Sequence, residues 1–313
     1  MNNKLPIAIF LMGTTASKKT HIAMKLAHVL PIELISVDSA LIYKKLNIGT
    51  AKPNKNHQFY SKHWLIDIKE PYQKYSVYDF YQDTINIMCN ITKKGKIPLL
   101  VGGTIFYYHR LMNAMSPLPK SNQYIRNIIF QQIKNKKFSS YHNMLCQIDP
   151  ISAKRIHFND TKRIIRAIEI FFITGKTLST LIKTPGPILP YYIYQFALTY
   201  FNRDQLFQSI TQRIMDMIDL GFESEVRYLI NNQYLKEDYP AMHCIGYKQM
   251  LYYIQNKINF SNMINDIIKM TKYLSKKQIT WLKKINNIQW FDSTYENKIY
   301  DTIIKLVKNS IYK

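Results

Sequence analysis

The feature that most constrains the fold of this chain is an apolar run near the N-terminus that leads directly into a loop of small, hydroxyl-bearing and basic residues. Residues 5–12 (LPIAIFLM) have the length and continuity of a strand buried on both faces. The loop at residues 13–20 (GTTASKKT) follows at once, and after it Ile22, Leu26 and Leu30 repeat with helical spacing. A strand, a turn and a helix in this order predict the opening unit of an α/β sheet.

The alternation of apolar runs and helical segments continues beyond this opening. Each run is short and continuous, and the gaps between runs have room for a helix, as at residues 77–92. Strands connected by helices are typical of a parallel sheet with helices on its faces. Besides residues 5–12, strands are expected at residues 32–37, 64–68, 97–101, 192–199 and 288–291.

The loop at residues 13–20 stands where a phosphate-binding P-loop requires it, between a strand and a helix. Its backbone N–H groups would line an anion site at the positive end of the helix. Lys19 would reach the terminal phosphates, and the Thr20 hydroxyl would be a ligand of Mg²⁺. The P-loop pattern asks for glycine at the sixth position, where this chain has Lys18. A side chain there is expected to crowd the phosphates, or to strain the backbone if φ must be positive. A basic turn that binds nothing stays open as the alternative.

Two proline-rich stretches, at residues 116–121 (SPLPKS) and 183–190 (KTPGPILP), interrupt the alternating pattern. Between them only helical signals occur. The clearest helix has Asn159 or Asp160 as its candidate N-cap and Gly175 at its end. The expected division is a P-loop NTPase-like α/β core with C-terminal helices at residues 1–120 and 187–313, and an all-helical insertion domain at residues 121–186.

The balance of charge bears on the partner of this chain. Its net charge is +23, with 43 lysines and arginines against 20 aspartates and glutamates. Clustered basic residues favour a nucleic-acid partner, because they displace counterions from a phosphate backbone. Only 8 of the 43 are arginine, however, and this excess of lysine is also what an AT-rich genome imposes. Charge alone therefore leaves a nucleic-acid partner and a merely solvated basic surface both open.

Signals for a membrane or for secretion are not found in the sequence. No stretch of about 18 apolar residues occurs, so no membrane span is expected. The N-terminal apolar run lacks the small-residue cleavage site of a secretion signal. The three cysteines, Cys89, Cys146 and Cys244, lie far apart without the paired spacing of a disulfide framework or a zinc site. We therefore expect a cytoplasmic protein.

Three groups of residues are candidates for the sheet edge where ligands bind in open α/β folds: two follow expected strands, and one lies on an expected helix. Asp38 comes directly after the second strand and has the chemistry of a general base, although an aspartate here also commonly caps the next helix. Gly102, Gly103 and Thr104 follow a later strand and aim at the same edge, unless the two glycines only form a tight turn. Arg213 lies on an amphipathic helix, so its guanidinium points either towards this edge or into solvent.

These motifs, in this order and across nearly the whole chain, resemble those of tRNA dimethylallyltransferases, the isopentenyl-diphosphate:tRNA (IPP) transferase family. The stretch DSALIY followed by IGTAKP carries the resemblance most specifically. The other segments that carry it are GTTASKKT, IPLLVGGTIFYY, SPLP, HCIGYKQM and KKQITWLKK. The resemblance implies transfer of a dimethylallyl group from dimethylallyl diphosphate to the exocyclic amine of the adenosine at tRNA position 37, 3′ of the anticodon. The products would be N6-dimethylallyladenosine and pyrophosphate. It further implies Mg²⁺ as cofactor, the tRNA anticodon stem-loop as partner, and a monomer.

The resemblance also implies roles for individual residues. Asp38 corresponds to the general base, and Thr104 to a catalytic position near the target adenosine. The diphosphate or nucleotide site comprises Gly13, Thr14, Thr15, Ala16, Ser17, Lys18, Lys19, Thr20 and Arg213, with Thr20 as the metal ligand. The tRNA contacts are Asp38, Ser39, Ala40, Leu41, Thr104, Arg126, Lys162, Arg163, Ile164, Ile165, Arg166, His243, Cys244, Ile245, Gly246, Tyr247, Lys248, Lys276, Lys277, Gln278, Ile279, Thr280, Trp281, Leu282 and Lys283. The departures from the family pattern are Lys18 for glycine, Thr14 for a usual proline, and His243 for a usual arginine.

Two other classes of function stay open at this point. A P-loop small-molecule kinase would share the strand–loop–helix opening, but it leaves DSALIY and the basic insertion unexplained. A non-catalytic tRNA-binding relic with a decayed phosphate loop is compatible with Lys18. Retention of Asp38, Lys19, Thr20 and Thr104 together argues against such decay.

Overall fold

The computed structural model describes residues 5–53, 62–134, 140–184 and 186–311. The chain forms two compact units: Met1–Arg110 together with Pro190–Lys313, and Leu111–Leu189. The insertion expected at residues 121–186 falls inside the second unit, which also takes in the segments that enter and leave it. We call the first unit the core and the second the insertion unit.

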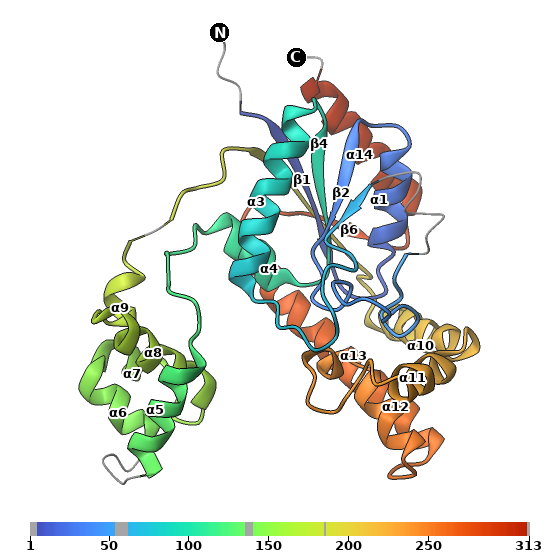
Figure 1. The fold of residues 1–313 in the computed structure, drawn as a ribbon. Coiled ribbons are helices and arrows are strands. Elements are labelled where there is room, and N and C mark those ends of the chain that lie inside the picture. Colours follow the sequence, from blue (N-terminus) through green and yellow to red (C-terminus); the bar gives the residue numbers. More distant parts are fainter. Residues whose placement is uncertain (1–4, 54–61, 135–139, 185, 312–313) are drawn as a thin grey trace. The chain divides into compact units, whose positions relative to one another are not determined.

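The core is built on a sheet of six parallel strands in the order β3-β2-β4-β1-β5-β6 (Figure 1). The central strand β1 is buried along most of its length because helices cover both faces of the sheet, as its unbroken apolar sequence predicts. The strands are β1 Ile7–Gly13, β2 Ile32–Ser36, β3 His63–Trp64, β4 Ile97–Gly102, β5 Tyr192–Thr199 and β6 Gln289–Asp292.

One expected strand is wrong in most of its length. Of residues 64–68 only Trp64 belongs to β3. The chain leaves the strand because Leu65 and Asp67 adopt left-handed backbone angles, φ 63° and φ 56°, which a β ladder cannot accommodate. The apolar side chains there are buried in a turn instead of a strand.

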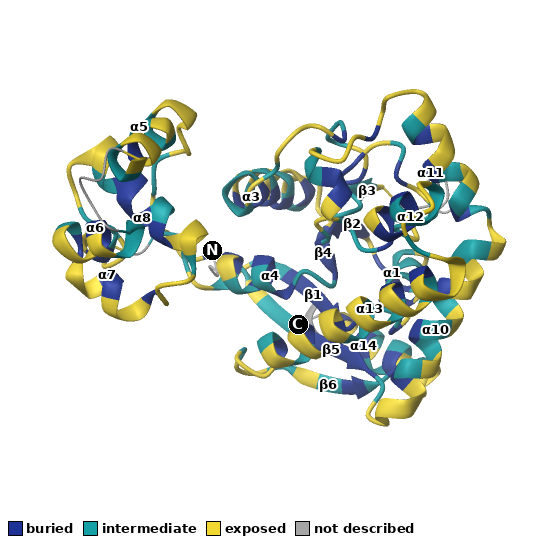
Figure 2. Cartoon of the chain, turned by 90° about the horizontal axis from the view of Figure 1, so that it is seen from below, coloured by how far each residue is buried: buried dark blue, intermediate teal, exposed yellow. Residues whose placement is uncertain are grey.

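Different helices cover the two faces of the sheet. On one face, α1 (Lys19–Ala27) and α14 (Glu296–Ile311) share a hydrophobic core with alternate residues of the strands, such as Leu11 and Phe196. On the other face, α3 (Val77–Lys93) and α4 (Ile105–Met112) supply aromatic rings: that of Tyr108 lies 5.3 Å from Phe10. Figure 2 shows the strands mostly buried between helices that have one buried and one exposed side. This packing holds the strand ends, and the loops that follow them, at one edge.

A second core lies among the C-terminal helices. Leu206, Ile210 and Phe222 pack there against buried apolar side chains of the segment that follows β2. The helices that form this core are α10 (Arg203–Asp219), α11 (Phe222–Asn231), α12 (Tyr247–Ile254) and α13 (Phe260–Leu282), with the short 3-10 helix η1 (Pro240–His243). In the described part of the chain, no helix is both long and apolar enough to cross a membrane, and this includes α13.

Helices are the only regular secondary structure in the described part of the insertion unit. Asp160 is the N-cap of α8, because its side chain accepts a hydrogen bond from the N–H of Arg163, and Gly175 ends the helix at φ 68°. Ile129, Leu145 and Ile168 belong to its small hydrophobic core. Its helices are α5 (Gln123–Lys134), α6 (Tyr141–Ile148), α7 (Pro150–Arg155), α8 (Thr161–Thr174) and α9 (Leu178–Leu181).

Candidate active site

A cavity of about 680 Å³ opens at the carboxyl edge of the sheet in the core. The loops after β1, β2 and β4 line it, because the carboxyl ends of parallel strands meet at the same edge. Helices α10 and α13 and residues 243–246 complete the lining. This is a size and position typical of a small-molecule site.

The phosphate loop is anchored to β5, and several of its backbone N–H groups are left without a hydrogen-bond acceptor among the described residues. Gly13 has φ 151°, and a Cβ there would lie 2.0 Å from the carbonyl oxygen of Leu198, so only glycine fits. The N–H of Thr14 donates to that same oxygen at 3.1 Å, and the Ser17 hydroxyl donates to the carbonyl of Thr14 at 2.7 Å. The backbone N–H groups of residues 16–20 donate to no acceptor among the described residues. Unpaired N–H groups at a helix N-terminus are the arrangement expected of an anion-binding loop, and anion binding by this loop stays a prediction.

Lys18 shows the backbone strain that its place in the loop predicts. Its backbone is left-handed, with φ 58° and ψ 16°, so the strain expected for a side chain at the sixth loop position is present. Its side chain is half exposed and lies 3.9 Å from a Glu296 carboxylate oxygen on α14. It does not line the cavity. The other expectation, that its stem crowds the phosphates, stays a prediction.

Lys19 is buried and folded back onto its own loop. Its ammonium group donates to the Thr14 carbonyl and, at 3.2 Å, to the Ser17 hydroxyl. The pKa of Lys19 is lowered to about 7, mainly by burial and also by the charge of Arg213, while the charge of Asp38 partly opposes the shift. A diphosphate in the cavity would favour the charged form of Lys19 and offer it a stronger acceptor.

Arg213 faces the cavity rather than the solvent. Its position on α10 brings a guanidinium nitrogen within 3.4 Å of the Thr50 carbonyl oxygen, which comes from the IGTAKP segment. Burial lowers the pKa of Arg213 and the charge of Asp38 raises it. The IGTAKP segment is itself held by Glu225, whose carboxylate accepts the N–H groups of residues 47–49. Sequence reasoning missed both Thr50 and Glu225.

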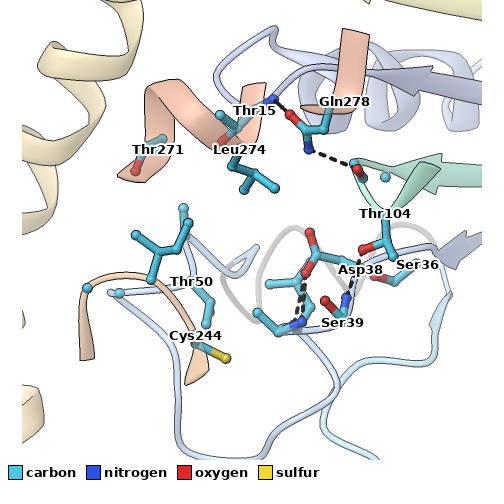
Figure 3. Close-up of a pocket in the computed structure, with 18 of the residues that line it drawn as sticks. Thr15, Ser36, Asp38, Ser39, Thr50, Thr104, Cys244, Thr271, Leu274 and Gln278 are labelled. Atoms are coloured by element: carbon cyan, nitrogen blue, oxygen red, sulfur yellow. Dashed lines mark hydrogen bonds between the residues drawn. The ribbon is translucent and has the colours of Figure 1, made fainter. Parts of the chain in front are cut away.

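Asp38 and Thr104 lie together on the opposite side of the cavity (Figure 3). One Asp38 oxygen, Oδ1, accepts the N–H groups of Ala40 at 2.8 Å and Leu41 at 3.4 Å. Among the described residues the other oxygen has no hydrogen-bond partner, and Figure 3 shows it pointing into the cavity. The Thr104 hydroxyl accepts the N–H of Ser39 at 3.1 Å, so its own proton is available to a ligand. Asp38 thus caps a turn rather than the helix that the sequence suggested, and its role as a general base stays a prediction.

The two glycines before Thr104 are required by close packing. A Cβ on Gly102 would lie 2.1 Å from the carbonyl oxygen of Val37, the residue before Asp38. The N–H of Thr104 donates to the same oxygen at 3.1 Å. Gly-Gly is therefore more than a tight turn, because it lets the β4 loop approach the β2 loop closely enough to join Thr104 to Ser39.

The remaining residues implied by the resemblance divide by location. Ser36 and His63 line the cavity as well, although the sequence analysis did not select them. Tyr247 is buried and donates its hydroxyl to Glu225 at 2.7 Å, so it is part of the support of the site rather than its surface. Those that line the cavity are Thr15, Thr20, Ser39, Ala40, Leu41, His243, Cys244, Ile245, Gly246, Lys277, Gln278 and Trp281. Those outside its lining are Lys248, Lys276, Ile279, Thr280, Leu282 and Lys283.

In the insertion unit, two of the expected tRNA-binding arginines have an internal partner. Arg126 and Arg166 both bind the carboxylate of Glu169, at 3.0 and 2.7 Å, and Glu169 is fully buried. Hydrogen bonds from these partners hold the pKa of Glu169 below its usual value against the opposing effect of burial. Arg163 is well exposed and pairs only with Asp160 of its own helix, and Lys162 is also exposed. The structure thus separates Lys162 and Arg163, which are free to meet a ligand, from Arg126 and Arg166.

Comparison with known proteins agrees with this geometry. A family model described as IPP transferase matches residues 41–285 of the chain. The chain is similar to the solved tRNA delta(2)-isopentenylpyrophosphate transferase of Staphylococcus epidermidis, with 28% identity, a TM-score of 0.70, and coverage of 97% of this chain and 99% of that one. The full-length tRNA isopentenylpyrophosphate transferase of Bacillus halodurans has 28% identity and a TM-score of 0.69, with 97% of each chain covered. A eukaryotic dimethylallyltransferase acting on tRNA has 25% identity and a TM-score of 0.80, covering 92% of this chain and 74% of that one.

Proposed function

This chain belongs to the IPP transferase family, and we propose that it transfers a dimethylallyl group from dimethylallyl diphosphate to the N6 amine of the adenosine at tRNA position 37. The observation that carries this proposal is one cavity with an open anion cradle on one side and a free carboxylate oxygen on the other. The first suits the diphosphate leaving group, and the second suits the amine. We further propose that the protein acts as a monomer in the cytoplasm.

The leaving group is served by positive charge that is already in place. The adenosine nitrogen forms a bond to the first carbon of the dimethylallyl group as the bond from that carbon to the diphosphate oxygen breaks. Negative charge then grows on the pyrophosphate, next to the N–H groups of residues 16–20, Lys19 and Arg213. Such preorganised donors stabilise a transition state without reorganisation of solvent. Lys19 must first leave the Thr14 carbonyl to reach the phosphate.

The amine is a weak nucleophile, because its lone pair is delocalised into the purine ring. As the new bond forms, the nitrogen loses a proton, and we propose that the free oxygen of Asp38, which points into the cavity, accepts it. A positioned base of this kind contributes roughly 10²- to 10⁴-fold in rate. The proton of the Thr104 hydroxyl is available to orient the base or its ribose. The adenosine must leave the base stack to enter the cavity, as enzymes that act on bases require.

The residues present fit a magnesium ion that arrives with the diphosphate. Thr20 lines the cavity at the start of α1, and its hydroxyl makes no hydrogen bond among the described residues, so it is available as a ligand. The described residues contain no group of three His, Cys, Asp or Glu side chains that could hold a metal by themselves. Phosphate oxygens and water would therefore complete the octahedral shell that Mg²⁺ prefers. When bound, the ion would neutralise charge on the leaving pyrophosphate.

Basic residues on both units are proposed to bind the tRNA backbone. Lys276 and Lys283 are exposed on or next to α13, beside the cavity, and Lys162 and Arg163 are exposed on α8. Their charges supply the counterion-release term that dominates affinity for nucleic acids. Arg126 and Arg166 are proposed to support this surface through Glu169 rather than to contact RNA themselves.

The test is a transfer assay with labelled dimethylallyl diphosphate and an unmodified anticodon stem-loop. Asp38→Asn keeps the oxygen that accepts the Ala40 N–H but removes the base, so we expect kcat to fall by about 10²-fold or more with little change in stem-loop binding. Asp301→Asn, an exposed carboxylate on α14, is the matched control. Transfer of label to the RNA in the wild type separates this function from both alternatives. Near-normal turnover by Asp38→Asn would remove Asp38 from the chemistry.

A further inference from the structure

Gln278 on α13 connects two loops of the cavity through a single side chain. Its Oε1 accepts the N–H of Thr15 in the phosphate loop at 2.9 Å. Its Nε2 donates to the carbonyl oxygen of Gly103 in the loop after β4 at 2.8 Å. The side chain is 6% exposed, and Figure 3 shows both hydrogen bonds crossing between the two loops.

This bridge begins where the sheet ends. The ladder between β1 and β4 has Met12 opposite Gly102 as its last pair. Beyond that pair no backbone hydrogen bond joins the two loops among the described residues. Gln278 supplies the missing connection three residues later on the β1 side, at Thr15, and one residue later on the β4 side, at Gly103. The two loops carry the anion cradle and Thr104, so the bridge lies between the two halves of the site.

The bridge requires an amide of this length. Gln278 donates and accepts at the same time, which neither a carboxylate nor an apolar side chain can do. The fit at Gly103 is tight, because a Cβ on Gly103 would lie 2.5 Å from the Gln278 Nε2. Glycine at position 103 is therefore matched to glutamine at position 278.

We propose that Gln278 is a positioning residue for transfer, which sets the separation between the diphosphate cradle and the Thr104–Asp38 side of the cavity. This assignment replaces the tRNA contact that family resemblance implies for Gln278, and it rests on the proposed function. The physical path runs from Gln278 to Gly103, then to Thr104, whose hydroxyl holds the N–H of Ser39 beside Asp38. A shift of the β4 loop relative to the phosphate loop would change the distance between the amine and the carbon that it attacks.

The proposal is tested with Gln278→Met, which keeps the length of the side chain but makes neither hydrogen bond. We expect kcat to fall by about 10- to 100-fold, because displacements of about 1 Å produce losses of this order. Affinity for the stem-loop, measured by direct binding, and the melting temperature should stay close to wild type. Lys276→Met, two residues earlier on the exposed side of the same helix, provides the contrast. It should raise the KM for RNA and leave kcat unchanged.

A second variant distinguishes positioning from general support of the fold. Gly103→Ala places a methyl group against Nε2, so it should break the same bridge. The double variant Gly103→Ala with Gln278→Met should then be no slower than the slower single variant, whereas independent effects would multiply. Multiplying effects would overturn the proposal. It would also be overturned by a kcat for Gln278→Met within twofold of wild type, or by a loss confined to the KM for RNA. A wild-type protein that transfers no label would instead refute the proposed function itself.

Discussion

Replacing Lys18 by glycine isolates the strain stored in the phosphate loop. Lys18 holds φ 58°, a left-handed angle that costs a residue with a Cβ roughly 1–2 kcal/mol and costs glycine almost nothing. Glycine also lowers the free energy of unfolding by about 0.4–1 kcal/mol, because it gives the unfolded chain more conformational freedom. The Lys18–Glu296 ion pair is long and half exposed, so its loss contributes about 0–1 kcal/mol.

The matched control is Lys18→Ala, which loses the same ion pair but keeps the Cβ. The difference between the two variants therefore contains only the strain and the unfolded-chain entropy. We expect Lys18→Gly to be more stable than Lys18→Ala by about 0.5–1 kcal/mol, measured from urea unfolding of the ligand-free protein with equal m-values. Because the Lys18 side chain does not line the cavity, all three proteins should transfer at rates within about twofold of one another.

Two results would refute this reasoning. If Lys18→Gly is no more stable than Lys18→Ala, the left-handed angle stores no strain that glycine relieves. If Lys18→Gly and Lys18→Ala both transfer several-fold faster than wild type, the lysine side chain does obstruct the diphosphate, and its contact with Glu296 does not describe the working enzyme.

The remaining predictions concern charge. The pKa of Lys19 is about 7 without ligand and a diphosphate favours its charged form, so binding takes up a proton above pH 7. Affinity for an unreactive thio-analogue of dimethylallyl diphosphate, measured by calorimetry, should therefore fall with rising pH by up to about tenfold per unit. Lys19→Met should abolish this dependence on pH. The same depressed pKa implies that the ligand-free protein gains stability as pH rises from about 7 towards the unfolded value of 10.5, and a flat profile in both measurements would mean that Lys19 is charged throughout. In the insertion unit, Arg163→Ala should weaken stem-loop binding and lower its salt slope by about one without loss of stability. Arg166→Ala should instead destabilise the insertion unit by about 2 kcal/mol, since it leaves buried Glu169 with one cation. Hydrogen exchange in α8 would report this change. If both variants weaken stem-loop binding equally and neither loses stability, the division between exposed Arg163 and supporting Arg166 is wrong.

Much of the fold can be predicted from local sequence. The strand expected at residues 192–199 is β5, Tyr192–Thr199, and the helix expected between Asp160 and Gly175 is α8 with those two caps. These predictions succeed because side-chain periodicity and capping chemistry act over a few residues. The same reasoning failed at the turn formed by Leu65 and Asp67, because the backbone angles that end a strand cannot be recognised in a pattern of apolar residues.

The candidate site was predictable in part. The phosphate loop, Asp38, Thr104 and Arg213 were all found from sequence, and they line or adjoin one cavity because parallel strands deliver their loops to one edge. Sequence reasoning also foresaw that Lys18 would strain the loop if its φ were positive. It could not foresee that the Lys18 side chain lies near Glu296 of the last helix, 278 residues further along the chain.

Only the tertiary structure decided which polar side chains meet one another. Glu169 lies three residues after Arg166, so that pair could have been found from helical spacing, but the approach of Arg126 from α5 could not. Thr15 and Gln278 are 263 residues apart, and nothing local to either one specifies the other. Residue types and short-range periodicity determine elements and the chemistry available to them. The partners of a buried amide or carboxylate are determined by packing, because an interior polar group must find whichever donor or acceptor the folded chain brings within about 3 Å.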